Sequence, residues 1–582
     1  MQLSAISHRP DSEDAFLYDK DHLRIRLHTA KNDIAKVTVF YNDPYMFMPD
    51  KEGKYIFHYH IKKMHLISKG QVHDHWGVTL TAKYHRIQYL FEIQDTSGRK
   101  IFLTDRGFRT ACKEGLNKTQ NYYRLPYFHE IDMVKTPEWV KGTVWYQIFP
   151  ERFSNGNKSN DRPNVKDWDP QTHPGREDFY GGDLQGVINH LDDLRELGVN
   201  GLYFCPIFKA SSNHKYDTID YKEVDPDFGD KGLFRQLVQE AHKRGMKVML
   251  DAVFNHIGVN SPQWHDVIKN GSKSKYADWF HINYFPVEPY HDPTKGQGEP
   301  PYDTFAWEPH MPKWNTANVE VQNYLLDIAS YWIKQFDIDA WRLDVAPEVD
   351  HNFWRLFRSK VDSLKKDFYI VGEIWHSAQS WLDGDQFSST MNYPFTQQIE
   401  DHFLLGTKTS HQMVELLSDQ LMLYRAQTNQ VMLNTLDSHD TPRILTMANG
   451  DKKLVYQTIA FTFMQTGSPC IYYGTEMGMT GGPDPDCRKP MDWSHKGDEF
   501  WQKIAGLVKF RLQNARILGK GNTRMRVTED GLIRIKRTES GQSILGYFNT
   551  TDKPVSCKMK AVLSQNFAND ILEPHGFVIG YN

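Results

Sequence analysis

The middle of the chain contains the apolar stretch Ile338-Asp339-Ala340-Trp341-Arg342-Leu343-Asp344-Val345. A helical pattern precedes it, because apolar residues between 325 and 333 recur at the spacing of one helix face. The stretch itself has the length and composition of a buried strand. Side chains alternate along a strand, so Arg342 and Asp344 point to the same side. Charges are costly to bury, and this pair is therefore either a structural ion pair or part of a site.

Seven further runs of this kind surround the stretch, and helical patterns separate them. Alternating strands and helices predict βα units and a parallel sheet. Eight such units are the number found in a closed (β/α)₈ barrel. We therefore predict a TIM barrel over residues 126–515. Its strand candidates are residues 144–149, 201–208, 247–254, 338–345, 369–375, 389–395, 431–436 and 470–473.

The two ends of the chain have a different pattern. Apolar and polar residues alternate at residues 23–27 and 86–93, and again at residues 532–535. With turn signals between such runs, this alternation is typical of β-sandwiches. The predicted architecture is multidomain, with an N-terminal β-sandwich at residues 1–125, the central barrel, and a C-terminal β-sandwich at residues 516–582.

One connection is too long for an ordinary barrel loop. Residues 258–315 follow the third strand candidate and contain no clear barrel element, which predicts an inserted subdomain. Its aromatic side chains have two open interpretations, a local core or one wall of a cleft in which rings stack on sugar faces. These side chains are Trp264, Trp279, Phe280, Tyr284, Phe285, Tyr290, Tyr302, Phe305 and Trp307.

The composition argues against several classes of protein. The 582 residues carry 69 Lys and Arg against 73 Asp and Glu, a net charge of −4, so we expect neither nucleic acid nor a membrane as a partner. The five cysteines are odd in number and far apart, which argues against a disulfide framework or a structural zinc site. No apolar signal core follows the first residues, and a cytoplasmic location is expected.

Polar residues follow the ends of four strand candidates. In a TIM barrel such residues meet at the C-terminal face, where the chemistry takes place. Charges at four strand ends make a purely structural interpretation of Arg342 and Asp344 much weaker. The full set comprises Asp251, His256, Arg342, Asp344, Glu373, Trp375, His439 and Asp440.

Cleavage of a glycosidic bond requires such a set, because two carboxyl groups flank its oxocarbenium-like transition state. Arg342 would keep the neighbouring Asp344 ionised and able to attack. Glu373, with an indole beside it, would stay protonated as the general acid. Asp440 would bind sugar hydroxyls. Metal-assisted hydrolysis also uses Asp, Glu and His, but residues 126–515, the predicted barrel, contain no His-x-His or His-Glu-x-x-His spacing.

These segments resemble the signature regions of glycoside hydrolase family 13, the α-amylase family. The similarity extends over most of the chain, at residues 145–152, 201–208, 251–256, 341–344, 372–375 and 438–440. Within the family, the chain most resembles the group of neopullulanases, cyclomaltodextrinases and maltogenic amylases. The marker of that group is Met-Pro-Lys-Leu-Asn, and residues 311–315 here read Met-Pro-Lys-Trp-Asn. The group also carries an extra N-terminal β-sandwich.

The resemblance implies a role for each matching position. Asp344 matches the nucleophile, Glu373 the acid/base and Asp440 the stabiliser of the transition state. Tyr216 matches the aromatic platform under the sugar beside the cleaved bond. The positions implied in substrate binding are Tyr216, Asp251, His256, Arg342, Glu348, Trp375 and His439.

The implied activity is retaining hydrolysis of α-1,4 and also α-1,6 glucosidic bonds in cyclodextrins, pullulan, maltooligosaccharides and starch, with transglycosylation as a side reaction. In the similar group, a glutamate at the position of Glu348 is associated with acceptance of both kinds of bond. Two departures leave the preferred substrate open, because Trp314 replaces the Leu of the group and Pro347 stands where Asn is common. The alternatives are a glucanotransferase or α-1,6-glucosidase of the same family, and a non-catalytic amylase-like scaffold, which the three acids disfavour.

A loop after the first strand candidate is rich in Asn, Asp and Gly. On composition alone such a loop is usually a turn. The resemblance implies a structural Ca²⁺ site here, and oxygen atoms are the ligands that Ca²⁺ prefers. Asn157 stands where Asp is common. The implied ligands are Asn155, Asn157, Asn160, Asp161, Gly181 and Asp183.

The N-terminal β-sandwich has no acid–base set of its own. It is either a starch-binding module or a dimer-forming lid. In the similar group this module of one subunit covers the cleft of the other, which implies a homodimer. Its aromatic candidates for contact with a glucan or a partner are Tyr41, Tyr45, Phe47 and Tyr89.

Overall fold

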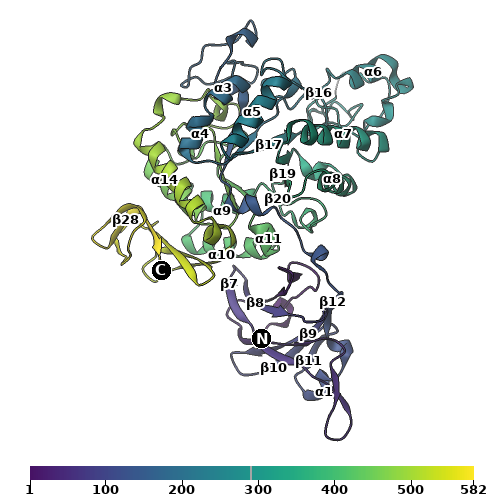
Figure 1. The fold of residues 1–582 in the computed structure, drawn as a ribbon, viewed down its shortest axis with the longest axis vertical. Helices are drawn as coiled ribbons and strands as arrows, with labels where there is room; N and C mark the ends of the chain where they lie inside the picture. Colours follow the sequence, from purple (N-terminus) through teal and green to yellow (C-terminus); the bar gives the residue numbers. More distant parts are fainter. Residues whose placement is uncertain (289–290) are drawn as a thin grey trace.

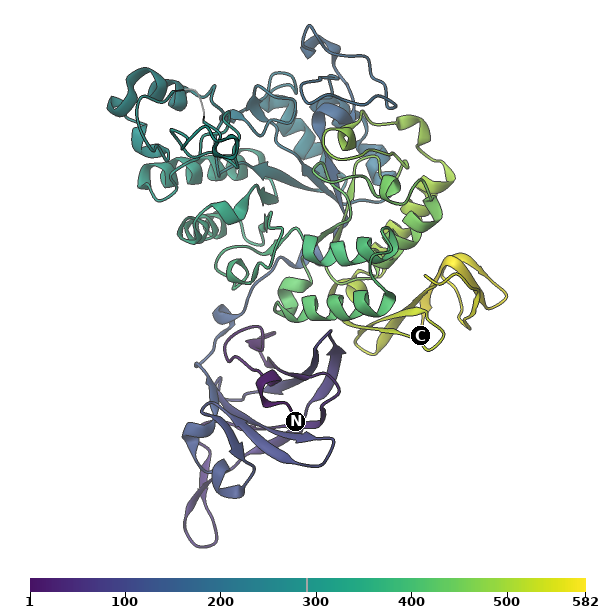
Figure 2. The ribbon, with the colours of Figure 1, turned by 180° about the vertical axis from the view of Figure 1, so that it is seen from behind.

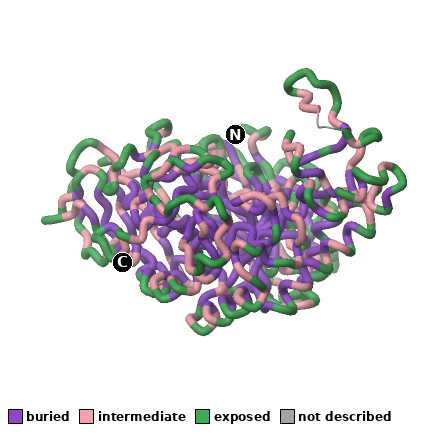
Figure 3. Tube along the Cα trace, turned by 90° about the horizontal axis from the view of Figure 1, so that it is seen from above, coloured by how far each residue is buried: buried purple, intermediate pink, exposed green. Residues whose placement is uncertain are grey.

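The computed structural model describes residues 1–288 and 291–582, which form three parts (Figure 1). The N-terminal sheets, in purple, lie at one end, and the barrel forms the largest part. The C-terminal sheet, in yellow, packs on the side of the barrel, as the view from behind also shows (Figure 2). Buried segments run through the middle of the molecule and exposed segments follow its loops (Figure 3). The predicted fold class is confirmed.

All eight predicted runs contribute a strand to one parallel sheet. Its order is β20-β19-β18-β17-β14-β13-β22-β21, and a parallel bridge between Met391 and Leu433 joins the two ends of the ring. One predicted strand was too long, because residues 393–395 begin a helix that has Pro394 in its first turn. The barrel strands are β13 (Trp145–Ile148), β14 (Gly201–Phe204), β17 (Lys247–Ala252), β18 (Ala340–Leu343), β19 (Tyr369–Gly372), β20 (Ser389–Thr390), β21 (Leu433–Thr435) and β22 (Ser468–Tyr472).

Helices form the outer layer of the barrel. The helix α7 (Val319–Phe336) begins after Asn318, whose side chain accepts a hydrogen bond from the Glu320 N–H, and ends at Asp337 in a left-handed conformation. The helix face that the apolar spacing predicted is buried. The other helices of the barrel are α2 (Pro150–Phe153), α3 (Leu184–Asn189), α4 (Leu191–Leu197), α5 (Lys231–Lys243), α8 (His351–Leu364), α9 (Tyr393–Phe403), α10 (Ser410–Met422), α11 (Ala426–Asn429), α12 (Ile444–Met447), α13 (Lys452–Phe463) and α14 (Glu499–Gln513).

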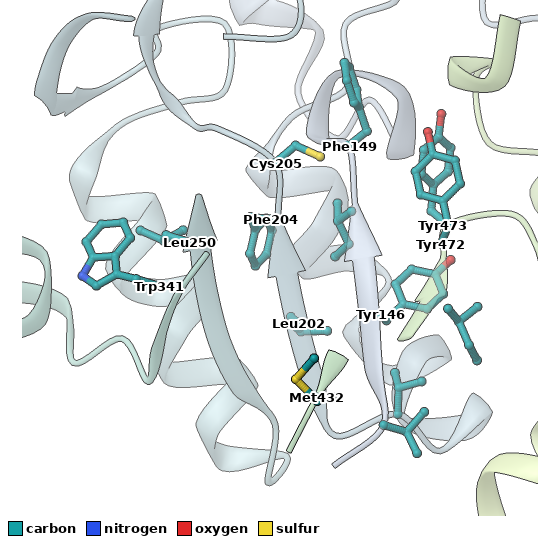
Figure 4. Close-up of a cluster of buried hydrophobic side chains, with 14 of the residues drawn as sticks. Tyr146, Phe149, Leu202, Phe204, Cys205, Leu250, Trp341, Met432, Tyr472 and Tyr473 are labelled. Carbon is teal, nitrogen blue, oxygen red and sulfur yellow. The ribbon is translucent and has the colours of Figure 1, made fainter. Parts of the chain in front are cut away.

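Side-chain alternation divides the barrel strands between two cores. Leu202, Leu250 and Trp341 belong to the large cluster between sheet and helices, part of which Figure 4 shows. Tyr203 and Met249, each next in sequence to one of these, belong to a separate cluster inside the barrel. Because successive strand residues face opposite sides, the following inward positions toward the carboxyl ends of the strands carry the polar groups of the site.

The inserted subdomain lies between β17 and α7 and carries α6 (Pro262–Asn270). The described aromatic residues of the subdomain differ in their surroundings. Trp264 packs against Phe280 and Tyr302 in a local core, whereas Phe305 lines a cleft at the mouth of the barrel. Tyr290 lies outside the described residues.

Trp314 belongs to the same local core. It is buried, its ring stacks on Phe280 with centroids 4.8 Å apart, and its indole N–H donates to the Tyr221 hydroxyl at 3.1 Å. The replacement of Leu by Trp at this position therefore enlarges the core of the subdomain. Trp314 itself does not line the cleft, to whose wall the subdomain contributes Phe305, Glu308 and Met311.

Two large antiparallel sheets form most of the N-terminal part, in the orders β1-β2-β8-β7 and β11-β10-β9-β3-β6, with β12 paired to β9, and β4 and β5 form a small third sheet. Their apolar faces enclose one core, as in a sandwich. Tyr89 is fully buried in it, so its predicted contact with a glucan or partner is wrong. The elements are β1 (Ala15–Leu17), β2 (His22–Ala30), β3 (Ile34–Asn42), β4 (Phe47–Pro49), β5 (Tyr55–Phe57), β6 (His60–Lys63), β7 (His65–Lys69), β8 (His73–Thr81), β9 (Ile87–Asp95), β10 (Lys100–Thr104), β11 (Gly107–Thr110), α1 (Lys113–Leu116) and β12 (Tyr123–Leu125).

The C-terminal part, predicted as a β-sandwich, is all-β as expected but forms one antiparallel sheet, in the order β23-β24-β25-β28-β26, with β27 also paired to β28. It packs on α13, where Phe548 meets Phe461 with ring centroids 5.2 Å apart. Within the described chain, no helix is both long enough and apolar enough to cross a membrane. The strands are β23 (Asn522–Val527), β24 (Ile533–Glu539), β25 (Gln542–Phe548), β26 (Val555–Ser556), β27 (Leu563–Ala568) and β28 (Ile571–Tyr581), and a hairpin of β15 (Phe208–Ala210) and β16 (Thr218–Val224) lies in the barrel part.

Candidate active site

The carboxyl ends of the barrel strands bring four charged side chains to one place. Asp251 on β17 and Arg342 on β18 are partners in the strand register. Asp344 directly follows β18, and Glu373 directly follows β19. The parallel sheet therefore gathers at one end of the barrel residues that lie up to 122 positions apart in the sequence, a separation that follows from the numbers of Asp251 and Glu373.

Arg342 joins three carboxylates. Its Nη1 lies 3.0 Å from Asp251 Oδ2 and 2.7 Å from Asp344 Oδ1, and its Nη2 lies 2.9 Å from Glu373 Oε1. All four side chains are buried. The positive charge offsets part of the cost of burying the acids, and one planar guanidinium fixes the separation between Asp344 and Glu373.

A second group of side chains lies beside the acids. The Tyr216 hydroxyl is 2.6 Å from His439 Nε2 and donates to Asp251 Oδ2 at 3.0 Å, and the Tyr216 and His439 rings are parallel within 4°. Asp440, the next residue, lies 3.2 Å from the guanidinium of Arg488. The structure thus brings the predicted platform, histidine and third acid to the same mouth of the barrel.

A cleft of about 410 Å³ opens over these groups. The barrel contributes the acids to its floor, and the inserted subdomain contributes Phe305, Glu308 and Met311 to its wall. The other lining residues are Arg176, His214, Tyr216, His256, Asp344, Val345, Glu373, Trp375, His439, Asp440, Asp484 and Arg488.

The remaining predicted sugar contacts surround the cleft. His256 Nε2 is buried and has no hydrogen-bond partner among the described residues, so it is free to bind a hydroxyl. Trp375 is 49% exposed and stacks on Tyr393 at 3.7 Å, which leaves part of its ring accessible. Glu348 lies farther out, where its carboxylate pairs with Lys313 at 3.1 Å.

Family models match both main parts of the chain: the catalytic domain of α-amylases at residues 147–505, and the N-terminal Ig-like domain of α-amylases at residues 1–129. The chain belongs to the α-amylase family. The intracellular maltogenic amylase of Bacillus subtilis is 46% identical over 94% of this chain and 91% of its own. Neopullulanase 2 of Thermoactinomyces vulgaris is 42% identical over 90% of this chain and 86% of its own. A solved cyclomaltodextrinase structure has a TM-score of 0.88 and 39% identity, covering 100% of this chain and 98% of that chain.

These matches confirm the resemblance to the group of cyclomaltodextrinases, maltogenic amylases and neopullulanases, and with it the prediction of a glycoside hydrolase. In this α-amylase-family chain, burial dominates the proton affinity of two acids of the site. Burial raises the pKa of Asp344 well above its ordinary value and that of Asp251 to about 6, although the Arg342 charge opposes both shifts. Carboxylates around one guanidinium titrate as a unit. The predicted effect of Arg342 on Asp344 is therefore present, but burial outweighs it.

Burial favours the neutral form of the two histidines predicted to bind substrate, His256 and His439. Burial lowers the pKa of His256 to about 3 and holds that of His439 well below its ordinary value. The contacts of His439 assign its tautomer. The Tyr216 hydroxyl donates to Asp251, so His439 Nε2 donates to that hydroxyl, and the Gln147 amide donates to His439 Nδ1 at 2.9 Å. A neutral imidazole can accept or donate to sugar hydroxyls without adding charge to the acid cluster.

Three residues that complete the site were not predicted from the sequence. Gln147 on β13 fixes the orientation of His439. Arg488, in the loop after β22, donates to the His439 carbonyl at 2.7 Å and pairs with Asp440 at 3.2 Å and Asp484 at 2.9 Å. Gln147 lies within the similar segment at residues 145–152, but no role was assigned to it, and no motif marks Arg488 or Asp484. For these two, the only available signal was that the loop after the eighth strand also reaches the mouth of the barrel.

The candidate calcium loop presents oxygen atoms suited to a cation. Among the described residues, Asn155 Oδ1 and Asn160 Oδ1 are buried without a hydrogen-bond partner. The Asn155 amide donates to Asp161 Oδ1 at 2.8 Å. A Cβ at Gly181 would collide with Asn155 and Asp161, so glycine is required for their close approach. These four positions fit a Ca²⁺ site.

The two other candidates are engaged in capping. Both oxygens of Asp183 accept backbone N–H groups, including that of Gly186 in α3, and the Asn157 side chain accepts the Ser159 N–H. Within the described residues, no three His, Cys, Asp or Glu side chains gather as a metal-binding group. The candidate loop falls outside that definition because most of its candidate ligands are side-chain amide oxygens of Asn. Ca²⁺ accepts such oxygens as ligands.

We predict that the acidic limb of the pH profile lies higher than that of ordinary carboxyl groups. The profile of kcat/KM reports groups of the free enzyme. Because burial raises the pKa of Asp344 and brings that of Asp251 to about 6, kcat/KM on a short α-glucan should fall as the pH drops through about 6. Asp251→Asn should move this limb, whereas Asp337→Asn, at the end of α7, should not. A wild-type limb near pH ~4 would contradict the prediction.

Proposed function

We propose that this α-amylase-family chain is a retaining hydrolase of α-glucosidic bonds. The observation that supports this most directly is that two nitrogens of Arg342 contact Asp344 and Glu373. One guanidinium can bridge two carboxyl groups only when they are close together. Retaining enzymes hold these groups about 5–5.5 Å apart, whereas inverting enzymes leave about 6.5–9.5 Å for a water molecule.

In the proposed reaction, Glu373 is the general acid and Asp344 the nucleophile. Glu373 gives its proton to the glycosidic oxygen while the bond to the anomeric carbon breaks and an Asp344 oxygen forms a bond to that carbon. Glu373 then removes a proton from water, whose oxygen attacks the anomeric carbon and releases Asp344. Two displacements at the same carbon retain its configuration.

The surrounding side chains are proposed to hold the sugar at the cleaved bond. Tyr216 would lie under the ring, and His256, with its unpartnered Nε2, would bind a hydroxyl. Asp440 would bind further hydroxyls and strengthen these contacts in the transition state. Its pairing with Arg488 supports this role, because that contact orients the carboxylate at the cleft.

The proposed substrates are cyclodextrins, maltooligosaccharides, pullulan and starch, with both α-1,4 and α-1,6 bonds accepted. The names of the relatives support these substrates. Phe305 narrows the cleft from one side, and the half-exposed Trp375 offers a surface for a second sugar. Transglycosylation follows when a sugar hydroxyl replaces water in the second displacement. A glucanotransferase would show that reaction as its main one, so product analysis separates the two activities.

We predict that Asp344→Asn lowers kcat by more than about a thousandfold, because the amide cannot form the glycosyl ester. The melting temperature should stay near that of the wild type, and Asp337→Asn serves as the matched control. Proton NMR of the first product formed by the wild type should show the α-anomer. An initial β-anomer would refute the retaining mechanism.

We propose a structural Ca²⁺ held by Asn155, Asn160, Asp161 and the Gly181 backbone. The buried, unpartnered amide oxygens of Asn155 and Asn160 support it. None of these residues lines the cleft that contains the acids, so the ion would stabilise the fold and take no part in the chemistry.

Removal of calcium should therefore lower the melting temperature. An ion that binds only the folded state adds about 2.7 kcal/mol at a hundredfold excess over its dissociation constant. Asp161→Asn should abolish the effect of a chelator, and Asp169→Asn, in the neighbouring loop, should retain it. A melting curve that a chelator leaves unchanged, with no calcium in elemental analysis, would exclude the site.

We propose that the N-terminal sandwich pairs two chains and narrows the cleft. Tyr45 is 71% exposed, Tyr55 68% and Ile61 60%. These three apolar side chains lie in the strands and loops around β4 to β6. Large exposed apolar side chains that gather on one domain mark interaction surfaces, and a symmetric pair is the commonest oligomer.

The full chain should then run as a dimer at micromolar concentration. The double variant Tyr45→Ser/Tyr55→Ser should weaken the dimer and lower the ratio of cyclodextrin to starch activity, because an open cleft admits long chains. Light scattering gives the mass, and Ile131→Ser, at an exposed position outside the patch, is the control. A monomeric wild type that still prefers cyclodextrin would show that the lid proposal is wrong.

We also propose a cytoplasmic location. The name of the Bacillus subtilis relative, an intracellular enzyme, supports it. All five cysteines are free thiols, and four of them are buried, which is compatible with a reducing compartment.

A further inference from the structure

Four side chains form an unbroken hydrogen-bonded chain between the N-terminal sandwich and the barrel. Asp14 Oδ1 lies 2.6 Å from His28 Nε2, and His28 Nδ1 lies 2.7 Å from His75 Nδ1. His75 Nε2 lies 2.7 Å from Oδ1 of Asp419, which belongs to α10 of the barrel. All four ring nitrogens of the two histidines are therefore in use.

The backbone holds these groups in place. His28 and His75 are direct partners in the β2–β8 register, so their side chains lie on the same face. Asp419 Oδ2 accepts the Gln71 N–H at 2.9 Å. A Cβ at Gly70 would collide with the Asp419 carboxylate, so only glycine permits this approach. The chain of contacts is thus built into the docking surface between the two domains.

The contacts determine the number of protons. An ionised carboxylate only accepts hydrogen bonds, so the Nε2 atoms of His28 and His75 must both carry a proton. The contact between the two Nδ1 atoms requires one more proton. Three protons on four nitrogens make one imidazolium and one neutral imidazole. Two neutral rings would place two lone pairs face to face, and two charged rings would place two N–H groups face to face.

The surroundings favour this single shared charge. Burial alone would raise the pKa of Asp14, but the His28 contact brings it below its ordinary value, and the same holds for Asp419 with His75. Burial lowers the pKa of His75, which disfavours a second charge. The other groups that face the chain are Arg26 and His8 near Asp14, His73 on β8, Ser68 on β7, and the Lys31–Glu415 pair beside α10.

We propose that Asp14, His28, His75 and Asp419 form a proton-dependent clamp that holds the N-terminal sandwich on the barrel. In the closed clamp, each Nε2 atom carries a proton and one further proton lies between the two Nδ1 atoms. The closed clamp keeps this third proton over a range of pH. In the open state each imidazole is solvated and titrates near about 6.5. Below that pH the open state binds one proton more than the closed state, and above it one fewer. Opening is therefore favoured on both sides, and the clamp is tightest near about pH 6.5.

The rest of the interface keeps the domains together when the clamp opens. The Arg26 guanidinium donates to the carbonyls of Met422 and Tyr424 at 3.2 and 2.9 Å, and the Gln427 amide donates to the Leu17 carbonyl at 2.8 Å. None of these contacts includes a group that titrates between about pH 5 and 8. Opening therefore loosens α10 and β8 and leaves the sandwich attached.

Amide hydrogen exchange of the full-length protein tests the clamp. The protection of α10 and β8, corrected for the intrinsic pH dependence of exchange, should be greatest near about pH 6.5. It should fall on either side by up to about tenfold for each pH unit, because opening is linked to one proton. A protection profile that is flat or changes in one direction only between about pH 5 and 8 would overturn the proposal.

Variants separate the clamp from a general effect of histidine. His28→Gln and His75→Gln should each remove the maximum, and His73→Gln, on the same strand but outside the chain, should keep it. Retention of the maximum in His28→Gln, or its loss in His73→Gln, would refute the clamp. If zinc or a chelator shifts the wild-type melting temperature but not that of His28→Gln, the pair binds a metal ion and the clamp is wrong.

Discussion

The buried charge of Arg342 is the interaction on which the active site depends. Three carboxylates lie within 3.0 Å of its guanidinium, and without that charge their burial would be prohibitive. The same side chain fixes the spacing of Asp344 and Glu373 and couples the titration of the acids. Geometry and proton affinity at this site are therefore two consequences of one contact, and a change at Arg342 would alter both.

The barrel makes this contact possible because its strands separate apolar from polar positions. Outward positions such as Leu250 and Trp341 pack against helices, and the lower inward positions, such as Met249, fill the barrel. The last inward positions, Asp251 and Arg342, carry the charges of the site. The apolar layer beneath them excludes water, which strengthens the ion pairs, and the open end above them admits the substrate.

The parts outside the barrel act on the site from a distance. The inserted subdomain uses most of its aromatic side chains for its own core and presents Phe305 to the cleft. The N-terminal sandwich docks on α10, on the outer layer of the barrel, through the His28–His75 pair and Asp419. The sandwich would reach a cleft only in the proposed dimer, where it would cover the cleft of the second subunit. Loosening of the clamp would therefore affect substrate access only through that dimer.

The sequence by itself determined the parallel barrel, the flanking β domains and the identity of the acids, because alternation and strand ends are local patterns that a single chain displays. Asp344, Glu373 and Asp440 were found in this way. Only the tertiary structure decided that Tyr89 and Trp314 are core residues, that Arg488 and Gln147 complete the site, and that His28 meets His75 and Asp419. Those outcomes depend on contacts between residues that are distant in sequence. Burial also decides the proton affinity of the acids: Arg342 alone would lower the pKa of Asp344, but burial raises it.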